Sequence, residues 1–429
     1  MRRAIVVGSG AGGAAAARDL AGTFQVTIME EGGPFSPFDM GIPAMETLKA
    51  SGVLLDERMT ALLFPAMRIR RSREGMALVN GRCVGGTTTI SAGNALRMDQ
   101  DLREIGIDLD REFQELYRDV PVSADHSSTW RADTRELFDA CAGMGLSPRA
   151  TPKLIDFTKC RRCGRCILGC PARAKWDARK FVEDAVERGA RLHTGSRVER
   201  IQLENGRATG VWVRRGLGGR FLPAHVVVVA AGGLGTQRIL DRSGIPTEDS
   251  LFVDPVRCIA GRREGTGAPG EISMPFVVQQ DSFILSPYFD YLSYFFNGGW
   301  KRPQSGVISL MVKLADESGG TARGRRVRKD LSARDRKVLS GALDLCRSIF
   351  RRAGVDESSL ALGTVNAGHP GGTLPLHPAD ARSLHPAQLP ANVYVADASL
   401  LPRSLGNPPI LTVMALSRAV AKKVMEAAA

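Results

Sequence analysis

Gly8-Ser9-Gly10-Ala11-Gly12-Gly13 directly follows the apolar run Ala4-Ile5-Val6-Val7 near the start of the chain. A strand, a glycine-rich turn and a helix in this order form the phosphate-binding turn of a Rossmann-type βαβ unit. A second apolar run, 26–29, ends at Glu30, where an acidic side chain meets a ribose hydroxyl in such units. We therefore expect a dinucleotide site built on Gly8, Gly10, Ala11, Gly13 and Glu30. This motif does not distinguish FAD from NAD.

Length and composition indicate a soluble α/β enzyme of two domains. The chain has 429 residues, of which 43% are hydrophobic and 47 are glycine. An apolar strand begins almost at once, which leaves no room for a signal peptide, and no apolar run has membrane-spanning length. We therefore expect no membrane span and a cytoplasmic location. In that setting the 8 cysteines are reduced thiols or metal ligands.

The net charge of +13 raises the question of nucleic-acid binding. The arginines are spread along the chain, and the densest basic run, 323–329, contains no aromatic residue. A solvated loop explains this run better than a nucleic-acid surface does. We expect no nucleic-acid partner, although a basic surface could dock an acidic redox protein or an anionic substrate.

Hydrophobic periodicity predicts several further elements. Alternation in 197–203 and 208–213 predicts a hairpin, and 225–231 predicts a buried strand that enters a second glycine turn. Helices are expected over 180–189, with an apolar stripe, and over 333–353. Short β-type runs between 276 and 312 predict a second domain on an antiparallel sheet. Aromatic residues concentrated in 288–300 suggest either an apolar substrate or domain core.

Four cysteines, Cys160, Cys163, Cys166 and Cys170, stand in the spacing C-x2-C-x2-C-x3-C-P. This is the spacing of bacterial ferredoxins, which hold iron–sulfur clusters. A zinc site is a weaker alternative because zinc sites usually show two separated C-x2-C pairs, and a disulfide is disfavoured in a chain that does not look secreted. We expect a 4Fe–4S cluster. Its fourth ligand is either Cys170 or a remote thiol, and the remote thiols are Cys83, Cys141, Cys258 and Cys346.

Beside the N-terminal turn, three further blocks resemble the glucose–methanol–choline (GMC) family of FAD-dependent oxidoreductases. They are Gly85-Gly86-Thr87-Thr88, then Ala230-Ala231-Gly232-Gly233, and finally Val395-Ala396-Asp397 with Asn407-Pro408. The resemblance implies FAD, held by the N-terminal turn and by a second set of residues. That set is Gly85, Gly86, Thr87, Val198, Ala231, Gly232, Asp397 and Pro408.

In this family a histidine and a second histidine or asparagine lie over the flavin ring. The matching positions are His369, in Gly368-His369-Pro370, and Asn407. A neutral imidazole is suited to accept a hydroxyl proton near neutral pH, and an amide can orient the substrate oxygen. The resemblance therefore implies that His369 and Asn407 are catalytic.

Together these observations predict an α/β fold in which a Rossmann-like FAD-binding domain is interleaved with an antiparallel-sheet substrate domain, plus a small iron–sulfur insert. The expected FAD-binding parts are 1–150, 181–250 and 389–429, the insert is 151–180 and the substrate domain is 251–388. The expected activity is oxidation of an alcohol, or reduction of a carbonyl, by hydride transfer at FAD. Electrons would pass through the cluster to a protein acceptor. Two alternatives are a non-catalytic electron-transfer subunit and an oxygen-using oxidase with a structural zinc.

Overall fold

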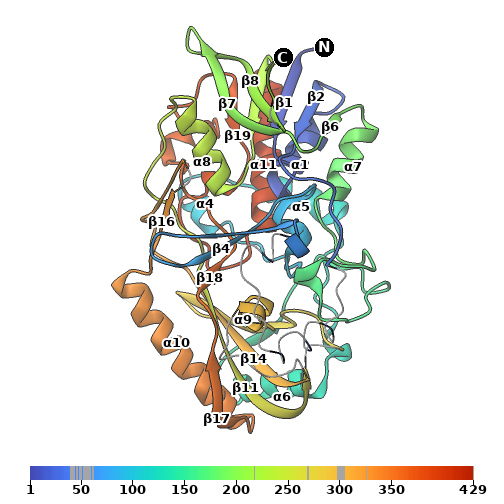
Figure 1. Ribbon diagram of the computed structural model, residues 1–429, viewed down its shortest axis with the longest axis vertical. Coiled ribbons are helices and arrows are strands. Elements are labelled where there is room, and N and C mark those ends of the chain that lie inside the picture. The colour runs from blue at the N-terminus through green and yellow to red at the C-terminus, as the bar shows by residue number, and fades with distance from the viewer. Residues whose placement is uncertain are drawn as a thin grey trace.

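The computed structural model describes residues 1–38, 62–216, 218–267, 270–296, 305–324 and 326–428, and the single residues Ala44, Thr47, Ser51 and Met59. Two sheet-centred halves follow one another along the long axis of the molecule (Figure 1). The N-terminal strand and the C-terminal helix belong to the same half, where Arg2 donates a hydrogen bond to the carbonyl oxygen of Ala428 over 2.8 Å. Both ends of the described chain therefore contribute to one half of the fold.

The first half is built on a parallel sheet whose five strands have the order β19-β10-β1-β2-β6. Every pair of neighbours in it is parallel. Its strands are β1 (Arg3–Val7), β2 (Gln25–Met29), β6 (Arg191–His193), β10 (Val226–Val229) and β19 (Val393–Val395). The β10 sequence is four valines, all buried, because a central parallel strand is covered on both faces. The Rossmann-like sheet predicted from the N-terminal motif is confirmed.

Helices cover this parallel sheet. Helix α1 (Ala11–Leu20) contacts α11 (Ile410–Glu426) and α7 (Arg179–Glu187), while α5 (Asp110–Asp119) contacts α11. The small residues of α1 permit this close packing. The predicted helix over 180–189 is confirmed as α7, and Phe181, Val182 and Ala185 are buried. Val186 was expected in the same stripe but is 44% exposed, because its place on the helix turns it to solvent.

The second half contains a sheet of nine strands in the order β3-β4-β18-β11-β14-β13-β12-β5, with β17 paired to β11. It is antiparallel except that β18 and β4 run parallel. Its strands are β3 (Met67–Arg71), β4 (Ala77–Gly81), β5 (Pro148–Ala150), β11 (Val256–Gly267), β12 (Phe276–Gln279), β13 (Phe283–Pro287), β14 (Ser305–Leu314), β17 (Asp356–Leu362) and β18 (Asn366–Ala367). The expected second, antiparallel sheet is therefore present, with one parallel pair.

Helices α10 (Ala333–Arg352) and α6 (Ala132–Ala142) pack together beside this sheet, as the lower part of Figure 1 shows for α10. Helix α10 confirms the helix predicted over 333–353. It begins at a capping box, in which Ser332 and Asp335 each accept a hydrogen bond from the other's backbone N–H.

The remaining elements are smaller. The predicted hairpin is confirmed as β7 (Arg197–Glu204) and β8 (Arg207–Arg215), which form a sheet with β9 (Gly218–Pro223). Strands β15 (Thr321–Arg323) and β16 (Arg326–Arg328) pair with each other. The other helices are α8 (Gly233–Arg242), α4 (Gln100–Glu104) and α9 (Tyr291–Phe296), and the 3-10 turns are η1 (Gly86–Ile90), η2 (Ser127–Thr129), η3 (Cys166–Leu168), η4 (Pro378–Asp380) and η5 (Ala398–Leu400).

One of the predicted domain ranges contributes strands to both sheets. The segment 1–150 supplies β1 and β2 to the parallel sheet but β3, β4 and β5 to the other sheet. The division into domains by residue range stays a prediction.

Of the aromatic segment 288–300, residues 297–300 lie outside the described residues. Among the helices that the structure describes, none is long and apolar enough to cross a membrane.

Candidate active site

Two cavities adjoin each other at His369. The first has a volume of about 230 Å³ and opens beside the glycine turn at the carboxyl end of the parallel sheet. The second has a volume of about 160 Å³ and is lined by residues of β11 and β14, among others. His369 and Gly368 line both cavities. We call the first the cofactor cavity and the second the substrate cavity.

Glycines of the N-terminal turn are required by backbone packing. A Cβ on Gly12 would lie 1.9 Å from the carbonyl oxygen of Ala396, and one on Gly13 would lie 2.1 Å from that of Gly8. Gly8 has a φ of 103°, and a Cβ there would lie 2.2 Å from the carbonyl oxygen of Ala230. These contacts let α1 begin directly at the end of β1, so that its N-terminal N–H groups face the cofactor cavity.

Two buried carboxylates lie on the walls of the cofactor cavity. Glu30 accepts hydrogen bonds from the Ser9 hydroxyl over 2.6 Å and from the Gly32 backbone N–H over 2.7 Å. Asp397 accepts hydrogen bonds from the backbone N–H groups of Gly232 and Ser399, each over 2.8 Å. Burial raises the pKa of both carboxyl groups. A carboxylate has more acceptor positions than these bonds use, so Glu30 can still receive a ribose hydroxyl.

A group of arginines makes part of the same cavity strongly cationic. Arg68 and Arg70 come from β3, Arg197 starts β7 and Arg238 lies on α8. Glu31 is 3.2 Å from Arg68 and 3.8 Å from Arg238. Burial, together with the neighbouring arginines, lowers the pKa of Arg70 and of Arg238 to about 10. The Nε of Arg238 is buried without a hydrogen-bond partner.

The cofactor cavity fits a dinucleotide. Its excess of arginines and the N-terminus of α1 suit the two negative charges of a diphosphate. The unpartnered Nε of Arg238 is a donor that an anion could satisfy. Most of the residues predicted to bind the cofactor line the cavity, namely Gly8, Gly10, Ala11, Glu30, Gly86, Thr87, Val198, Ala231, Gly232 and Asp397.

Three of the predicted cofactor residues do not line the cofactor cavity. Gly13 packs against Gly8 behind the cavity wall. Gly85 precedes η1, where its φ of 92° is left-handed and its N–H donates to the Ser9 hydroxyl over 3.2 Å. Pro408 lines the substrate cavity. Gly13 and Gly85 therefore shape the turns, while other residues of these turns line the cavity.

The substrate cavity is mostly apolar. Its lining includes Phe38, Phe64, Met67, Ile167, Leu168 and Met311. The polar lining residues include Asn94, Lys313 and Asn366 besides His369. A cavity of this kind excludes water from an apolar ligand while presenting a few groups that fix its orientation.

His369 is held between charged groups on its inner side. Its Nδ1 lies 3.4 Å from Oδ2 of Asp254, and the same carboxylate oxygen lies 2.5 Å from Nζ of Lys313. The His369 side chain is 23% exposed, whereas Asp254 and Lys313 are 1% exposed. Burial and the positive charge of Lys313 lower the pKa of His369, against the opposing effect of Asp254. The imidazole is therefore neutral near pH 7, as a proton acceptor must be.

Asn407 is buried but is not among the lining residues of either cavity. Its amide group donates hydrogen bonds to Oε1 of Gln279 over 3.1 Å and to the carbonyl oxygen of Leu405 over 3.3 Å. Its Oδ1 has no partner. The residues after it, Pro408 and Pro409, reach the substrate and cofactor cavities respectively.

The cysteine segment, residues 151–180, forms part of the substrate cavity wall. Ile167 and Leu168 lie between Cys166 and Cys170, and both line the cavity. The carbonyl oxygen of Leu168 accepts a hydrogen bond from the Phe38 N–H over 2.8 Å. Arg162, Gly164, Gly169 and Arg173 have positive φ, so the chain turns sharply at several points of this loop.

Two buried lysines tie this segment to the loop beside the cofactor cavity. Lys175 donates hydrogen bonds to the carbonyl oxygens of Thr88, Thr89 and Ser91 over 2.9, 2.8 and 2.9 Å. Lys153 donates to Asn94 over 2.5 Å. Burial lowers the pKa of Lys175 to about 8 and that of Lys153 to about 7. The segment is thus fixed to residues of both cavities.

All 8 cysteines are free thiols. In the part of the chain that the structure describes, no three His, Cys, Asp or Glu side chains are close enough to hold a metal ion. Features that suit a sulfur ligand set are the four thiols of one short loop and backbone N–H groups of Arg162 and Lys175, each 3.5 Å from a cysteine sulfur. Cys83, Cys141, Cys258 and Cys346 each lie in a hydrophobic cluster.

The profile of the GMC oxidoreductase family matches residues 3–262, which is more than half of the chain. The chain belongs to this family and is a GMC-type oxidoreductase. Family membership and the fit of the cofactor cavity together support FAD as the cofactor.

The chain is 28% identical to an uncharacterised GMC-type oxidoreductase of Mycobacterium tuberculosis (strain ATCC 25618 / H37Rv), over 98% of this chain and 75% of the relative. It is 24% identical to a long-chain-alcohol oxidase of Arabidopsis thaliana, over 99% of this chain and 66% of the relative. Among solved structures, pyridoxine 4-oxidase from Mesorbium loti has a TM-score of 0.74 at 19% identity, with 98% and 99% of the two chains covered. That likeness shows the GMC fold.

Sequence reasoning missed Asp254, Lys313 and Arg238. Lys313 had a detectable signal, because it is a lone charge in the apolar strand run Val307-Ile-Ser-Leu-Met-Val-Lys313. Asp254 is similarly isolated among apolar neighbours in Phe252-Val-Asp254-Pro-Val256. A charge inside a buried strand is retained only when it is paired, and the partner was not readable from the local sequence.

Proposed function

We propose that this GMC oxidoreductase oxidises an apolar alcohol, with His369 as the proton acceptor. The observation that carries the proposal is that His369 lines both cavities. FAD, when bound, supplies the acceptor for the hydride that leaves the alcohol carbon. The hydroxyl proton goes to His369, and the alcohol becomes an aldehyde or ketone. The reverse reaction, reduction of the carbonyl, uses the same residues.

The names of related proteins support an alcohol as the substrate. Relatives in Arabidopsis thaliana are long-chain-alcohol oxidases, and a protein of the same fold is a pyridoxine 4-oxidase. The apolar lining of the substrate cavity favours an apolar alcohol. We keep Asn407 as the proposed companion that orients the substrate oxygen by donating an amide N–H to it, which requires Asn407 to exchange one of its bonds to Gln279 and Leu405.

Flavin reduction tests this proposal directly. The enzyme purified with its flavin is mixed without oxygen with straight-chain and aromatic alcohols, and the loss of flavin absorbance is followed. His369→Ala should slow reduction by about 10²–10⁴-fold, the usual effect of losing a general base. The amount of bound FAD should stay unchanged. Reduction of the variant at the wild-type rate would refute the role of His369.

We further propose that Cys160, Cys163, Cys166 and Cys170 hold a 4Fe–4S cluster. Support comes from their spacing, from the free thiols and from the two backbone N–H groups aimed at sulfur. A 4Fe–4S cluster supplies one-electron transfer when it is bound. The four sulfurs must converge to hold one cluster. The loop would order around the cluster as it binds, because metal binding and loop ordering are coupled.

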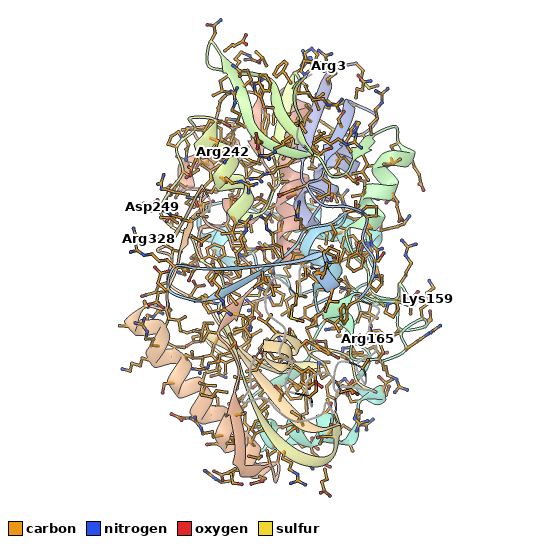
Figure 2. All side chains as sticks on the ribbon, in the orientation of Figure 1. Arg3, Lys159, Arg165, Arg242, Asp249 and Arg328 are labelled. Atoms are coloured by element: carbon orange, nitrogen blue, oxygen red, sulfur yellow. The ribbon has the colours of Figure 1, made fainter. Side chains whose placement is uncertain are left out.

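The surface around the cysteine segment suits an acidic redox protein. Lys159, Arg161, Arg162 and Arg173 are exposed, and Cys160, Cys163 and Cys170 are partly exposed among them. Lys159 projects from the outer edge of the molecule beside this segment (Figure 2). Positive charge at this point would steer an acidic electron acceptor toward the segment, and the attraction would weaken with salt.

Iron and zinc content decide between the proposed cluster and the alternatives. Protein made and purified without air should contain about four irons per chain, and Cys163→Ser should lose them. The same variant should still reduce its flavin with alcohol. Stoichiometric zinc without iron would contradict the cluster and favour a structural zinc site in an oxygen-using oxidase.

A further inference from the structure

The inner side of His369 is built from more charge than packing alone requires. Asp254 and Lys313 form one buried ion pair, and Asp316 and Lys329 form a second, with 2.8 Å between Nζ of Lys329 and Oδ2 of Asp316. The side chains of these four residues are at most 1% exposed. Buried ion pairs add little to stability compared with apolar residues of the same volume. The first pair, whose carboxylate faces His369, therefore points to a role in catalysis.

The sheet register brings Lys313 and His369 together. Val256 of β11 pairs with Lys313 of β14 on one side and with Asn366 of β18 on the other. His369 follows β18 by two residues, and Asp254 precedes β11 by two residues. Asp254 has a left-handed φ of 53°, which is uncommon for a residue other than glycine. Its backbone N–H donates to Asp316 over 2.8 Å, which helps to hold this conformation.

Asp254 faces only one of the two imidazole nitrogens. Nδ1 of His369 is buried, has no hydrogen-bond partner and lies 3.4 Å from Oδ2 of Asp254. The exposed 23% of the side chain therefore belongs to its other atoms. Within the described chain, Nε2 accepts no hydrogen bond. A carboxylate beside Nδ1 favours the tautomer that carries its proton on Nδ1, which leaves Nε2 as the basic nitrogen.

We propose that Asp254 and Lys313 are positioning residues for His369. Asp254 fixes the tautomer with a free Nε2 and stabilises the imidazolium formed when the alcohol proton arrives. Lys313 offsets the charge of Asp254, so that the ring is not protonated before the substrate binds. This inference rests on the proposed function of His369. It adds two residues that act through His369.

Other charged groups surround this assembly. The second pair sits behind the first, with Asp316 accepting from the backbone of Asp254, and Ser404 donates to the Asp254 carboxylate. Across the substrate cavity, Asp290 is buried, and burial raises the pKa of its carboxyl group. Of these groups, Asp254 and Lys313 act directly on the His369 ring.

The first test is the protonation of His369, measured by imidazole ¹⁵N chemical shifts on the flavin-loaded enzyme and assigned by comparison with His369→Gln. Wild type should show the proton on Nδ1. Asp254→Asn should move it toward Nε2 and lower the pKa of His369, because the anion is lost and Lys313 remains. Lys313→Met should raise that pKa. An unchanged tautomer and pKa in folded Asp254→Asn would overturn the inference.

Kinetics provide the second readout. Asp254→Asn should slow flavin reduction by about 10–10²-fold while KM changes by less than about threefold, since the wrong tautomer impairs proton transfer more than binding. Lys313→Met should move the acid limb of the pH profile upward, because a base with a higher pKa is protonated at higher pH. An unaltered reduction rate in Asp254→Asn, with the fold intact, would also contradict the inference.

Two double variants complete the design. Asp254→Asn/Lys313→Met removes the pair together and leaves no uncompensated charge, so it decides the question if Asp254→Asn does not fold. Asp316→Asn/Lys329→Met removes the charges of the second pair but keeps a side-chain oxygen at position 316 to accept from the backbone of Asp254, so as a matched control it should leave the tautomer of His369 unchanged. If no alcohol reduces the wild-type flavin, the proposed function fails, whereas the tautomer measurement still decides the inference.

Discussion

The two cavities that meet at His369 differ in charge and in origin. The cofactor cavity carries most of the charged groups, namely buried carboxylates, an arginine group and a helix N-terminus, whereas the substrate cavity is mostly apolar. The first is built largely from turns that follow strands of the parallel sheet. The second draws on the other sheet, on the cysteine segment and on Phe64. A charged cofactor and an apolar substrate require opposite surroundings, and a residue at the junction can act on both.

The strongest test of this contrast is Gly12→Ala in the turn of the cofactor cavity. The new Cβ would meet the Ala396 carbonyl oxygen at 1.9 Å, so α1 must move away from the sheet. We expect a loss of about 3 kcal/mol or more in the free energy of unfolding, and almost no bound FAD. Thermal unfolding and the ratio of flavin to protein absorbance measure both. Gly33→Ala is the control, because no atom lies within 4 Å of its Cβ.

Arg238→Met tests whether the arginine group binds the cofactor's negative charge. Losing a buried charged donor should weaken FAD binding by about tenfold or more. Titration of the apoprotein with FAD at several salt concentrations measures the affinity. Arg242→Met is the matched control, because Arg242 lies one turn further along α8 and its side chain is 43% exposed. Equal FAD affinity in the two variants would remove Arg238 from the cofactor site.

Leu168→Ala alters only the apolar cavity. Leu168 is 2% exposed and lines the substrate cavity, so its loss removes apolar contact with a bound alcohol. We expect KM for an apolar alcohol to rise by about fivefold, while FAD binding is unchanged. Val186→Ala, at an exposed position, should change neither. A loss of FAD from the Leu168 variant would show that the two cavities are not independent.

The smallest effect concerns pH. Burial and Lys313 lower the pKa of His369 from its usual value of about 6.5. The base is then neutral at pH 7, so flavin reduction should change less than about twofold between pH 8 and pH 7 and fall only below the usual histidine pKa. At these lower pH values His369 binds a proton more readily in the unfolded chain than in the folded protein, so the free energy of unfolding also falls with decreasing pH. Flavin reduction rates measured immediately after a pH jump separate protonation of the base from loss of stability. A decline beginning above pH 7 would contradict a neutral His369.

Some of the site could be read from the sequence because its chemistry is local. The turn after β1, Glu30 at the end of β2 and the turn after β10 each follow a strand directly, and the carboxyl ends of parallel strands meet at one edge of the sheet. His369 was found through its resemblance to a family block. The two cavities beside His369 could not be predicted, because the substrate cavity takes its walls from segments far apart in the chain.

The Rossmann-like sheet, the glycine turn and the family could be predicted from periodicity and short motifs alone. That β3, β4 and β5 join the second sheet, that Leu168 of the cysteine segment lines the substrate cavity, and that Asp254 and Lys313 lie behind His369 emerged only from the folded chain. A buried charge is stable only beside its partner, and strand pairing between distant segments brings the partner there.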